Sequence, residues 1–332
     1  MRHVVLGAGA IGGVVGGRLF EDGHEVVLIA RGAHLEAIRR DGLRVESPAG
    51  VATLAIPAVG HVGEVDWRTD DVVHVAVKSQ HTEAALADLV AVAPQVPVVC
   101  LQNGVANERA MLRLFADVQA VNVNMPATFV DPGVVQAWST PITGLLHVGR
   151  YPSGTNETTE AVAAAFRSAT FTSSPTPDIA RWKYRKLLTN LANAAEAACG
   201  PKARFGPLAK MLVAEGDAVL TAAGIDVATV EEDRERRGKQ LQMGEIDGRR
   251  HAGGSSWQSL ARGTGDIETD YLNGEIVLLG RLHGVPTPAN ELVQRLARDL
   301  ARGHERPGEL SEDEILDQLN HGTDATQGGE RS

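Results

Sequence analysis

The sequence predicts an α/β protein in which a doubly wound parallel sheet comes first and an all-helical domain follows. Short apolar runs alternate with helical patterns up to about residue 124, as expected of parallel strands joined by helices. A turn-rich stretch at residues 170–178 ends this pattern, and strand signals almost vanish beyond it. We therefore expect an α/β domain over residues 1–177, a helical domain over residues 178–302 and a tail over residues 303–332.

The individual elements follow from local spacing. Predicted strands are short apolar runs, at residues 3–6, 25–30, 71–77, 96–102 and 120–124. Predicted helices between them repeat apolar residues at helical spacing, at residues 10–22, 34–43 and 82–93. Residues 133–150 return to β-type runs that suit the edge of a sheet. In the second domain, helical patterns cover residues 178–199, 206–223, 228–243, 266–283 and 288–302.

Composition indicates an ordinary soluble protein. The chain has 332 residues, of which 43% are hydrophobic and 22% charged, enough for two domains with their own cores. The apolar N-terminus resembles a signal peptide, but Arg18 and the glycines before it favour a buried strand and helix. No apolar run is long enough to span a membrane. The only cysteines are Cys100 and Cys199, so we expect a reducing cytoplasm.

The charge is unevenly distributed. The net charge is −10, and residues 303–332 carry eight acidic and two basic side chains, so six of these negative charges lie in the tail. We expect the tail to be mostly disordered, with a short helical pattern in its middle. Nothing in this distribution indicates a nucleic-acid surface, and neither a nucleic acid nor a membrane is expected as a partner.

A glycine-rich turn follows the first predicted strand. The motif G-x-G-x-x-G is formed by Gly7, Ala8, Gly9, Ala10, Ile11 and Gly12. In a Rossmann-type βαβ unit the first glycine permits the tight turn, the second lets the backbone approach a pyrophosphate, and the third lets helix and strand pack closely. The helix N-terminus then offers N–H groups to the phosphates. The motif predicts dinucleotide binding; the alternative is a turn that serves packing alone.

The end of the second predicted strand indicates which dinucleotide is bound. Sites that prefer NAD usually place a carboxylate there, which accepts hydrogen bonds from the ribose hydroxyls. Here the strand ends in Ile29, Ala30 and Arg31. A guanidinium forms charge-assisted bonds with a 2′-phosphate, so we expect NADP(H). The alternative is that Arg31 is a solvated surface residue.

Polar residues also end two further strands. Lys78 follows the strand at 71–77, and Asn103 follows the strand at 96–102. In open α/β sheets the carboxyl ends of the strands face the ligand crevice, so both are candidate site residues. The alternatives are a solvent-exposed loop lysine and, because Gly104 follows, an asparagine that serves a turn.

The helix predicted at 178–199 combines an apolar body with a polar stripe. Lys186, Asn190 and Asn193 share one face, at spacings of four and seven residues. Such a stripe suits a cleft, where a lysine could donate a proton to a developing oxyanion. Lys183, one turn earlier, is a second candidate for this role, or else a surface residue or a phosphate contact. The alternative for the whole stripe is a dimer interface or a solvated face.

Taken together, these motifs resemble the ketopantoate reductase (2-dehydropantoate 2-reductase) family over about residues 1–302. The matching segments are GAGAIG at 7–12, Arg31, VK at 77–78, QNG at 102–104, DPGVV at 131–135, Lys186 with Asn190, and SSWQSLARGTGDIETDYLNG at 255–274. The resemblance implies NADPH-dependent reduction of a 2-oxo acid to a 2-hydroxy acid by a Rossmann domain and a helical domain. It also implies that the substrate is 2-dehydropantoate, on the route to pantothenate and coenzyme A.

The resemblance assigns roles to single residues. Lys186 matches the family's general acid, and Glu268 matches the carboxylate that positions substrate and lysine. Asn103 matches an asparagine near the nicotinamide and the substrate. Substrate contacts fall on Asn190 and Ser256, and Lys78 matches a lysine near the cofactor. From position alone, Glu268 could equally complement the dipole of the helix that it opens.

Two departures from the family pattern lie in the substrate region. Ala194 stands where a second asparagine is common, and Asn193 could cover part of that role. Ser259 and Leu260 replace the usual Gln-Asp. Two alternatives therefore stay open: the same chemistry on another bulky 2-oxo acid, and an NADP(H)-binding sensor without turnover. The sequence shows no metal-ligand cluster, and it leaves a homodimer possible.

Overall fold

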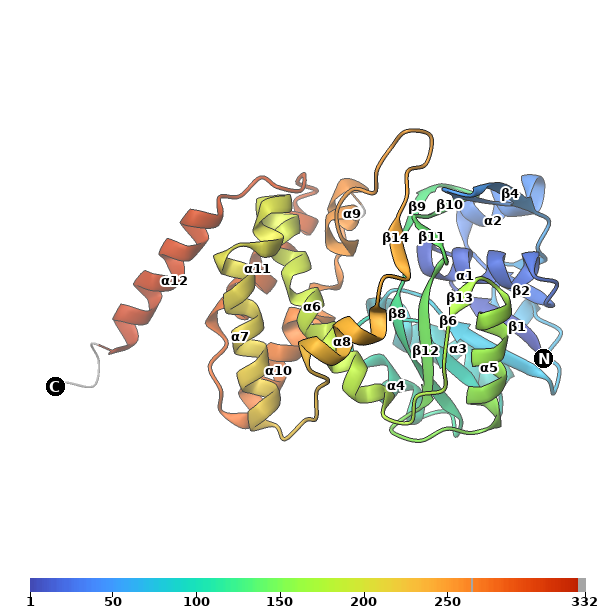
Figure 1. The fold of residues 1–332 in the computed structure, drawn as a ribbon, viewed down its shortest axis with the longest axis horizontal. Coiled ribbons are helices and arrows are strands. Elements are labelled where there is room, and N and C mark those ends of the chain that lie inside the picture. Colours follow the sequence, from blue (N-terminus) through green and yellow to red (C-terminus); the bar gives the residue numbers. More distant parts are fainter. Residues whose placement is uncertain (264, 328–332) are drawn as a thin grey trace. The chain divides into compact units, whose positions relative to one another are not determined.

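The structure, a computed structural model, describes residues 1–263 and 265–327, with side chains up to residue 321 (Figure 1). Contacts between Cα atoms divide the chain into two compact units. Unit 1 comprises Met1–Lys183 and Ala228–His251, and unit 2 comprises Tyr184–Val227 and Ala252–Ser332. Each unit is described by itself.

Unit 1 is built on an eight-stranded sheet. In sheet order its strands are β13 (Phe171–Thr172), β12 (Gly144–Arg150), β8 (Val118–Asn124), β7 (Val98–Cys100), β6 (Asp71–Val75), β1 (Arg2–Leu6), β2 (Val26–Ile29) and β5 (Ala58–Val59). The strands from β8 to β5 are parallel neighbours, and β12 runs antiparallel to β8. The strand order reverses between β1 and β6, and ligands of open α/β sheets bind at such a switch point.

Helices cover both faces of this sheet. On one face lie α1 (Ala10–Glu21) and α5 (Glu157–Ser168), and on the other lie α3 (Thr82–Val92) and α4 (Asn107–Leu112). Successive residues of a strand point to opposite faces, so Val5 joins the first apolar core and Val4 the second. All five residues of β1 and of β6 are buried, as is typical of parallel strands that are covered on both faces. The predicted doubly wound α/β fold is confirmed.

A second, four-stranded sheet packs on α1. Its order is β4 (Gly50–Leu54), β3 (Leu43–Ser47), β10 (Val134–Ala137) and β9 (Ala127–Asp131). The sequence analysis did not predict β3 and β4, although Leu43 and Val45 are buried and Arg44 between them is exposed. A Cβ atom on Gly13 of α1 would lie 2.9 Å from Val135 Cγ1, so a glycine there permits this close packing.

Residues 228–251 belong to unit 1, which differs from the sequential division expected at residue 177. They form α8 (Val230–Arg237) and β14 (Leu241–Met243) instead of one long helix. Strand β14 pairs with β11 (Ser139–Pro141), and Glu232 of α8 binds the Arg181 guanidinium through both carboxylate oxygens, at 2.9 and 2.8 Å. Such long-range pairings return the segment to unit 1. Short elements of unit 1 not yet named are α2 (Gly32–Asp41), η1 (Val62–Glu64) and η2 (Ser79–His81).

Unit 2 is helical. It contains α6 (Ile179–Cys199) from Tyr184 onward, η3 (Pro201–Phe205), α7 (Pro207–Ala222), α9 (Ser255–Ala261), η4 (Glu268–Tyr271), α10 (Asn273–His283), α11 (Pro288–Arg302) and α12 (Glu312–Gln327). Its core holds a buried polar network: Asn273 Nδ2 donates to the Leu191 carbonyl at 3.2 Å and to Asn290 Oδ1 at 3.0 Å. Asn290 Nδ2 donates in turn to Glu215 Oε2 at 2.8 Å. Satisfied networks of this kind specify one packing of the helices.

The acidic tail differs from the disordered segment that we expected. Residues Glu312–Gln327 form α12, in which Ile315 and Leu319, four residues apart, are buried. Glu312 Oε1 accepts a hydrogen bond from the Leu208 N–H at 3.0 Å, so an acidic side chain stabilises the N-terminus of α7. The low hydrophobicity of the tail hid this small apolar face. Residues 328–332 lie outside the described residues. Among the described helices, none has the length and apolar character needed to cross a membrane.

We predict that the free energy of unfolding falls as the pH is lowered from about 6.5 to about 4. Burial lowers the pKa of His3 to about 3 and that of His147 to about 4, so both imidazoles are neutral in the folded state. The unfolded state then binds more protons in this window, which costs up to about 1.4 kcal/mol per pH unit for each histidine. Urea unfolding at pH 7 and pH 5 measures the difference. In His147→Gln the pH dependence should be shallower, and equal wild-type stability at both pH values would contradict the prediction.

Candidate functional site

The glycine turn after β1 has the geometry that a dinucleotide loop requires. Gly7 adopts φ +102°, a conformation that side chains disfavour, and a Cβ atom there would lie 2.8 Å from the Val77 nitrogen. A Cβ atom on Gly12 would lie 2.1 Å from the Gly7 carbonyl oxygen. A Cβ atom on Gly9, by contrast, would meet no atom within 4 Å. Two glycines therefore serve packing, and the middle one leaves open space above the backbone.

The N-terminus of α1 suits an anion. The N-cap residue is Gly9, which has no side chain to accept a hydrogen bond from the first N–H groups of α1. The first turn contains no acidic residue. The first N–H groups of a helix have no acceptor within it, and the helix dipole adds partial positive charge. The residues present therefore fit the pyrophosphate of a dinucleotide.

His34 holds this turn from α2, a contact that the sequence analysis missed. Its Nδ1 atom accepts from the Gly133 N–H at 2.8 Å, so Nε2 carries the proton and donates to the Ala8 carbonyl at 2.7 Å. Burial lowers the pKa of His34, which favours this neutral form. Gly133 lies in the DPGVV segment, so the imidazole joins the glycine turn to the turn between β9 and β10. The spacing of these residues, 26 and 99 positions away, gave no local signal.

Arg31, which was predicted to favour NADP(H), lies at the carboxyl end of β2. It directly follows β2 and Ala30 and occupies the N-cap position of α2, with an exposed side chain. Within the described part of the chain, no hydrogen bond or ion pair engages its guanidinium. The group is therefore available to a phosphate.

Lys78 and Asn103 lie at one end of the sheet, beside the glycine turn. The register pairs Leu6 with Val75 and Val75 with Cys100, so β1, β6 and β7 end side by side. Both predicted residues follow these strand ends and are half-buried. The structure thus brings together, within unit 1, all the residues that were predicted to bind the cofactor near the switch point.

A buried amide network lies beneath these two strand ends. Gln102 Nε2 donates to the Val77 carbonyl at 2.7 Å and to Thr82 Oγ1 at 2.8 Å. Asn107 Nδ2 donates to Ser79 Oγ at 3.0 Å and to the Asn103 carbonyl at 3.4 Å. The loops that carry Lys78 and Asn103 are thereby cross-linked. The sequence analysis noted Gln102 only within a motif and did not predict this network.

Lys183 is neither a surface residue nor a phosphate contact, which corrects two of the sequence-based alternatives. Its side chain is 5% exposed, and its ammonium lies 2.5 Å from Glu108 Oε1. Burial lowers the pKa of Lys183, but the charge and hydrogen bond of Glu108 together with the neighbouring Cys100 and Tyr151 outweigh burial and raise the pKa above its ordinary value. A lysine held charged in this way is a poor proton donor, which leaves Lys186 as the candidate acid.

The polar stripe of α6 lies in unit 2. Lys186 is half-buried, whereas Asn190 and Asn193 are each 4% exposed. Asn193 Oδ1 accepts from Arg204 Nη1 at 2.7 Å, and its Nδ2 atom donates to Ser255 Oγ at 3.4 Å. The side-chain amide of Asn193 therefore connects α6 to η3 and to α9 through hydrogen bonds.

Ser256 is placed by the same segments. It is 3% exposed in the first turn of α9. The residue before this helix, Gly254, donates its N–H to Glu196 Oε2 of α6 at 3.0 Å, and Glu196 also accepts from Arg204 at 2.8 Å. A Cβ atom on Gly254 would lie 2.9 Å from Glu196 Oε2, so a glycine is needed for this approach.

Glu268 begins a short 3-10 helix, η4, rather than a long α-helix over 266–283. It is half-buried, and the following α10 starts at Asn273. Asn273, for which the sequence suggested no role, is the centre of the buried network that joins α6, α10 and α11. The residues predicted for catalysis and for substrate all lie in unit 2, apart from Asn103.

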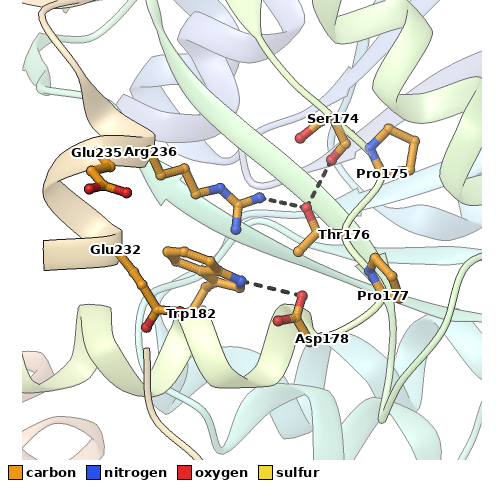
Figure 2. A pocket seen from close by; sticks show the side chains of 9 residues that line it. All are labelled: Ser174, Pro175, Thr176, Pro177, Asp178, Trp182, Glu232, Glu235 and Arg236. Carbon is orange, nitrogen blue, oxygen red and sulfur yellow. Dashed lines mark hydrogen bonds between the residues drawn. The ribbon is translucent and has the colours of Figure 1, made fainter. Parts of the chain in front are cut away.

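The pocket in Figure 2 lies elsewhere in unit 1. It has a volume of about 560 Å³ and is lined by Ser174, Pro175, Thr176, Pro177, Asp178, Trp182, Glu232, Glu235 and Arg236. The Arg236 guanidinium stacks on the Trp182 ring, 4.1 Å from its centroid, and donates to Thr176 Oγ1. None of the predicted site residues lines it, so the pocket is not the candidate site.

Comparison with known proteins identifies the family. Models described as "Ketopantoate reductase PanE/ApbA" and "Ketopantoate reductase PanE/ApbA C terminal" match residues 3–151 and 178–301. The chain belongs to the ketopantoate reductase family. It is accordingly an oxidoreductase that acts on a CH–OH group, as the sequence analysis predicted.

Individual ketopantoate reductases match over nearly their whole length. A 2-dehydropantoate 2-reductase from Pyrococcus horikoshii is 30% identical, covering 90% of this chain and 97% of that protein. Another from Halobacterium salinarum is 30% identical, covering 93% and 100%. Among solved structures, a PanE/ApbA family ketopantoate reductase from Ralstonia eutropha is 28% identical with a TM-score of 0.76, covering 92% and 99%. D-Mandelate dehydrogenase with NADH, at 21% identity and a TM-score of 0.76, shows the same fold.

We predict that alanine at Gly12 lowers stability, whereas alanine at Gly9 weakens cofactor binding. In Gly12→Ala the new Cβ atom overlaps the Gly7 carbonyl, so the variant should lose roughly 1–3 kcal/mol of stability or more. In Gly9→Ala the methyl group enters open space, so stability should stay within about 0.5 kcal/mol while binding of the nicotinamide cofactor weakens on the order of tenfold. Thermal unfolding and NADPH fluorescence titration measure both effects. Wild-type affinity in Gly9→Ala would exclude this turn from the cofactor site.

Proposed function

We propose that the protein reduces 2-dehydropantoate to pantoate with NADPH, a step on the route to pantothenate and coenzyme A. The observation that carries the proposal is the full-length match to relatives named 2-dehydropantoate 2-reductase. The reaction would take place in a reducing cytoplasm, in keeping with Cys100 and Cys199, which are free thiols. A homodimer stays a prediction.

The preference for NADPH rests on Arg31. An exposed guanidinium at the end of β2 offers paired donors to a 2′-phosphate. The carboxylate that usually binds the ribose of NAD is missing from the end of this strand, which reads Ile29, Ala30, Arg31. The glycine turn supports the pyrophosphate, and Lys78 and Asn103 lie next to it in unit 1.

The proposed chemistry needs one proton donor. When bound, the cofactor supplies a hydride to the carbonyl carbon, and negative charge builds up on the oxygen. Lys186 donates a proton to that oxygen, and Glu268 positions the lysine and the substrate. Asn190 and Ser256 would contact the substrate.

A second candidate is the same reaction on a different bulky 2-oxo acid. Ala194, at the position where the family commonly has asparagine, is 1% exposed in the core of unit 2. Asn193, the neighbour that could replace it, is bound to Arg204 and Ser255. Neither Ala194 nor Asn193 therefore supplies the substrate contact that the family's second asparagine makes. This favours a substrate that does not need that contact.

We predict that a substrate panel will place 2-dehydropantoate first and NADPH ahead of NADH. Steady-state kcat/KM values for 2-dehydropantoate and for other branched or aromatic 2-oxo acids, each with both cofactors, measure this order. Arg31 should make the NADPH preference at least about tenfold, as expected for one charge-assisted contact. If 2-dehydropantoate ranks among the poorest substrates, the second candidate is correct.

We predict that Lys186→Ala lowers kcat on the order of 10²-fold or more, because a positioned acid contributes that much to proton transfer. NADPH affinity should change less than about twofold, since the lysine acts on the substrate. Stopped-flow or steady-state kinetics together with NADPH titration give the two numbers. A mutant as active as the wild type would remove Lys186 from the mechanism, and Lys202→Ala, an exposed lysine of η3, serves as the control.

A further inference from the structure

The ammonium group of Lys183 is saturated by three buried acceptors of unit 1. It lies 2.5 Å from Glu108 Oε1 of α4, 2.8 Å from the Gln102 carbonyl and 3.3 Å from the Val121 carbonyl of β8. A lysine has three N–H donors, so each has one acceptor. The Lys183 and Glu108 side chains are 5% and 1% exposed. The Lys183–Glu108 contact is therefore a buried ion pair of the protein interior, not a solvent-exposed surface pair.

One of these acceptors belongs to the peptide that carries Asn103. The Gln102 carbonyl forms the peptide bond with the Asn103 nitrogen, so the ammonium fixes the plane from which the Asn103 side chain departs. On its other side Asn103 is held through its own carbonyl by Asn107, next to Glu108 in α4. The same Gln102 also holds the Val77 carbonyl, next to Lys78. The ion pair and the two amide side chains thus connect the backbone next to Lys78 with the backbone next to Asn103.

From this arrangement we infer that Lys183, paired with Glu108, is a positioning residue. It fixes the orientation of the Gln102–Asn103 peptide, so that the Asn103 side chain is placed to contact the nicotinamide end of the cofactor. The inference rests on the proposed function, in which Asn103 lies near the nicotinamide. Lys183 touches neither the cofactor nor the substrate in this account and acts only through the Gln102–Asn103 peptide. Its effect should be confined to the nicotinamide end, because Arg31 and the glycine turn hold the adenine and phosphate end independently.

The test variant replaces the pair without leaving a buried charge. Removing one partner alone would strand the other in the interior, so Lys183→Met is combined with Glu108→Gln. In this double variant the full-length protein should bind NADPH on the order of tenfold more weakly. Adenosine 2′,5′-bisphosphate, which lacks the nicotinamide, should bind within about twofold of the wild type. Amide hydrogen exchange of residues 101–106 should become on the order of tenfold faster.

A matched control is another buried ion pair of unit 1. Arg2 and Asp71 pair through two hydrogen bonds of 2.7 and 2.8 Å, at the amino ends of β1 and β6, away from the strand ends that carry the site. The variant Arg2→Met with Asp71→Asn should lose stability but bind both ligands alike. Glu108→Gln alone keeps the two carbonyl acceptors of Lys183, so its selective loss of NADPH affinity should be smaller than that of the double variant. If the double variant fails to fold, the affinities of Glu108→Gln for NADPH and for adenosine 2′,5′-bisphosphate test the inference instead.

The outcomes separate the inference from the proposed function. Equal weakening of both ligands, or the same selective loss of NADPH affinity in the Arg2 control, would overturn a positioning role for Lys183. Unchanged exchange at residues 101–106 would overturn it as well, whatever the ligands do. Failure of the wild type to bind NADPH would overturn the proposed function, and the exchange measurement would still decide the role of Lys183.

Discussion

The close approach of helix α1 to the end of strand β1 is the constraint on which the rest of the site depends. The 2.1 Å separation between a hypothetical Gly12 Cβ and the Gly7 oxygen shows that any side chain would push the two elements apart. With glycine at both places, the helix begins directly at the switch point of the sheet. The space above Gly9 then stays open, and the strand ends that carry Lys78 and Asn103 lie beside it.

Buried polar groups, rather than apolar contacts alone, place the candidate residues. In unit 1, Gln102 and Asn107 cross-link the strand ends, and the charged Lys183–Glu108 pair holds the same peptide. In unit 2, Glu196 of α6 accepts from the Gly254 N–H before α9 and from Arg204 of η3, and so ties α6 to both segments. Apolar side chains tolerate small shifts, whereas hydrogen bonds in a low-dielectric interior fix distance and direction. Such bonds suit sites in which proton and hydride transfer depend on sub-ångström placement.

The local signals in the sequence were sufficient for the fold class and for most of the long elements. The apolar runs of β1 and β6 and the helical pattern of α6 come from side-chain periodicity, which needs no distant partner. The elements that it missed depend on such partners. Strand β14 exists because it pairs with β11, and α12 exists because Ile315 and Leu319 find a surface in unit 2. The hairpin of β3 and β4 had an alternating pattern that could have been found.

By itself the sequence determined the glycine turn, most of the long elements of the α/β unit, and the residue types at the strand ends, because each of these is a property of neighbouring residues. Only the tertiary structure decided which of two lysines three positions apart is sequestered. Lys183 meets Glu108, 75 positions away, and becomes a buried, ion-paired group, while Lys186 stays half-buried. Charge pairing between residues far apart in the chain arises only on folding, and the spacing within one helix carries no information about it.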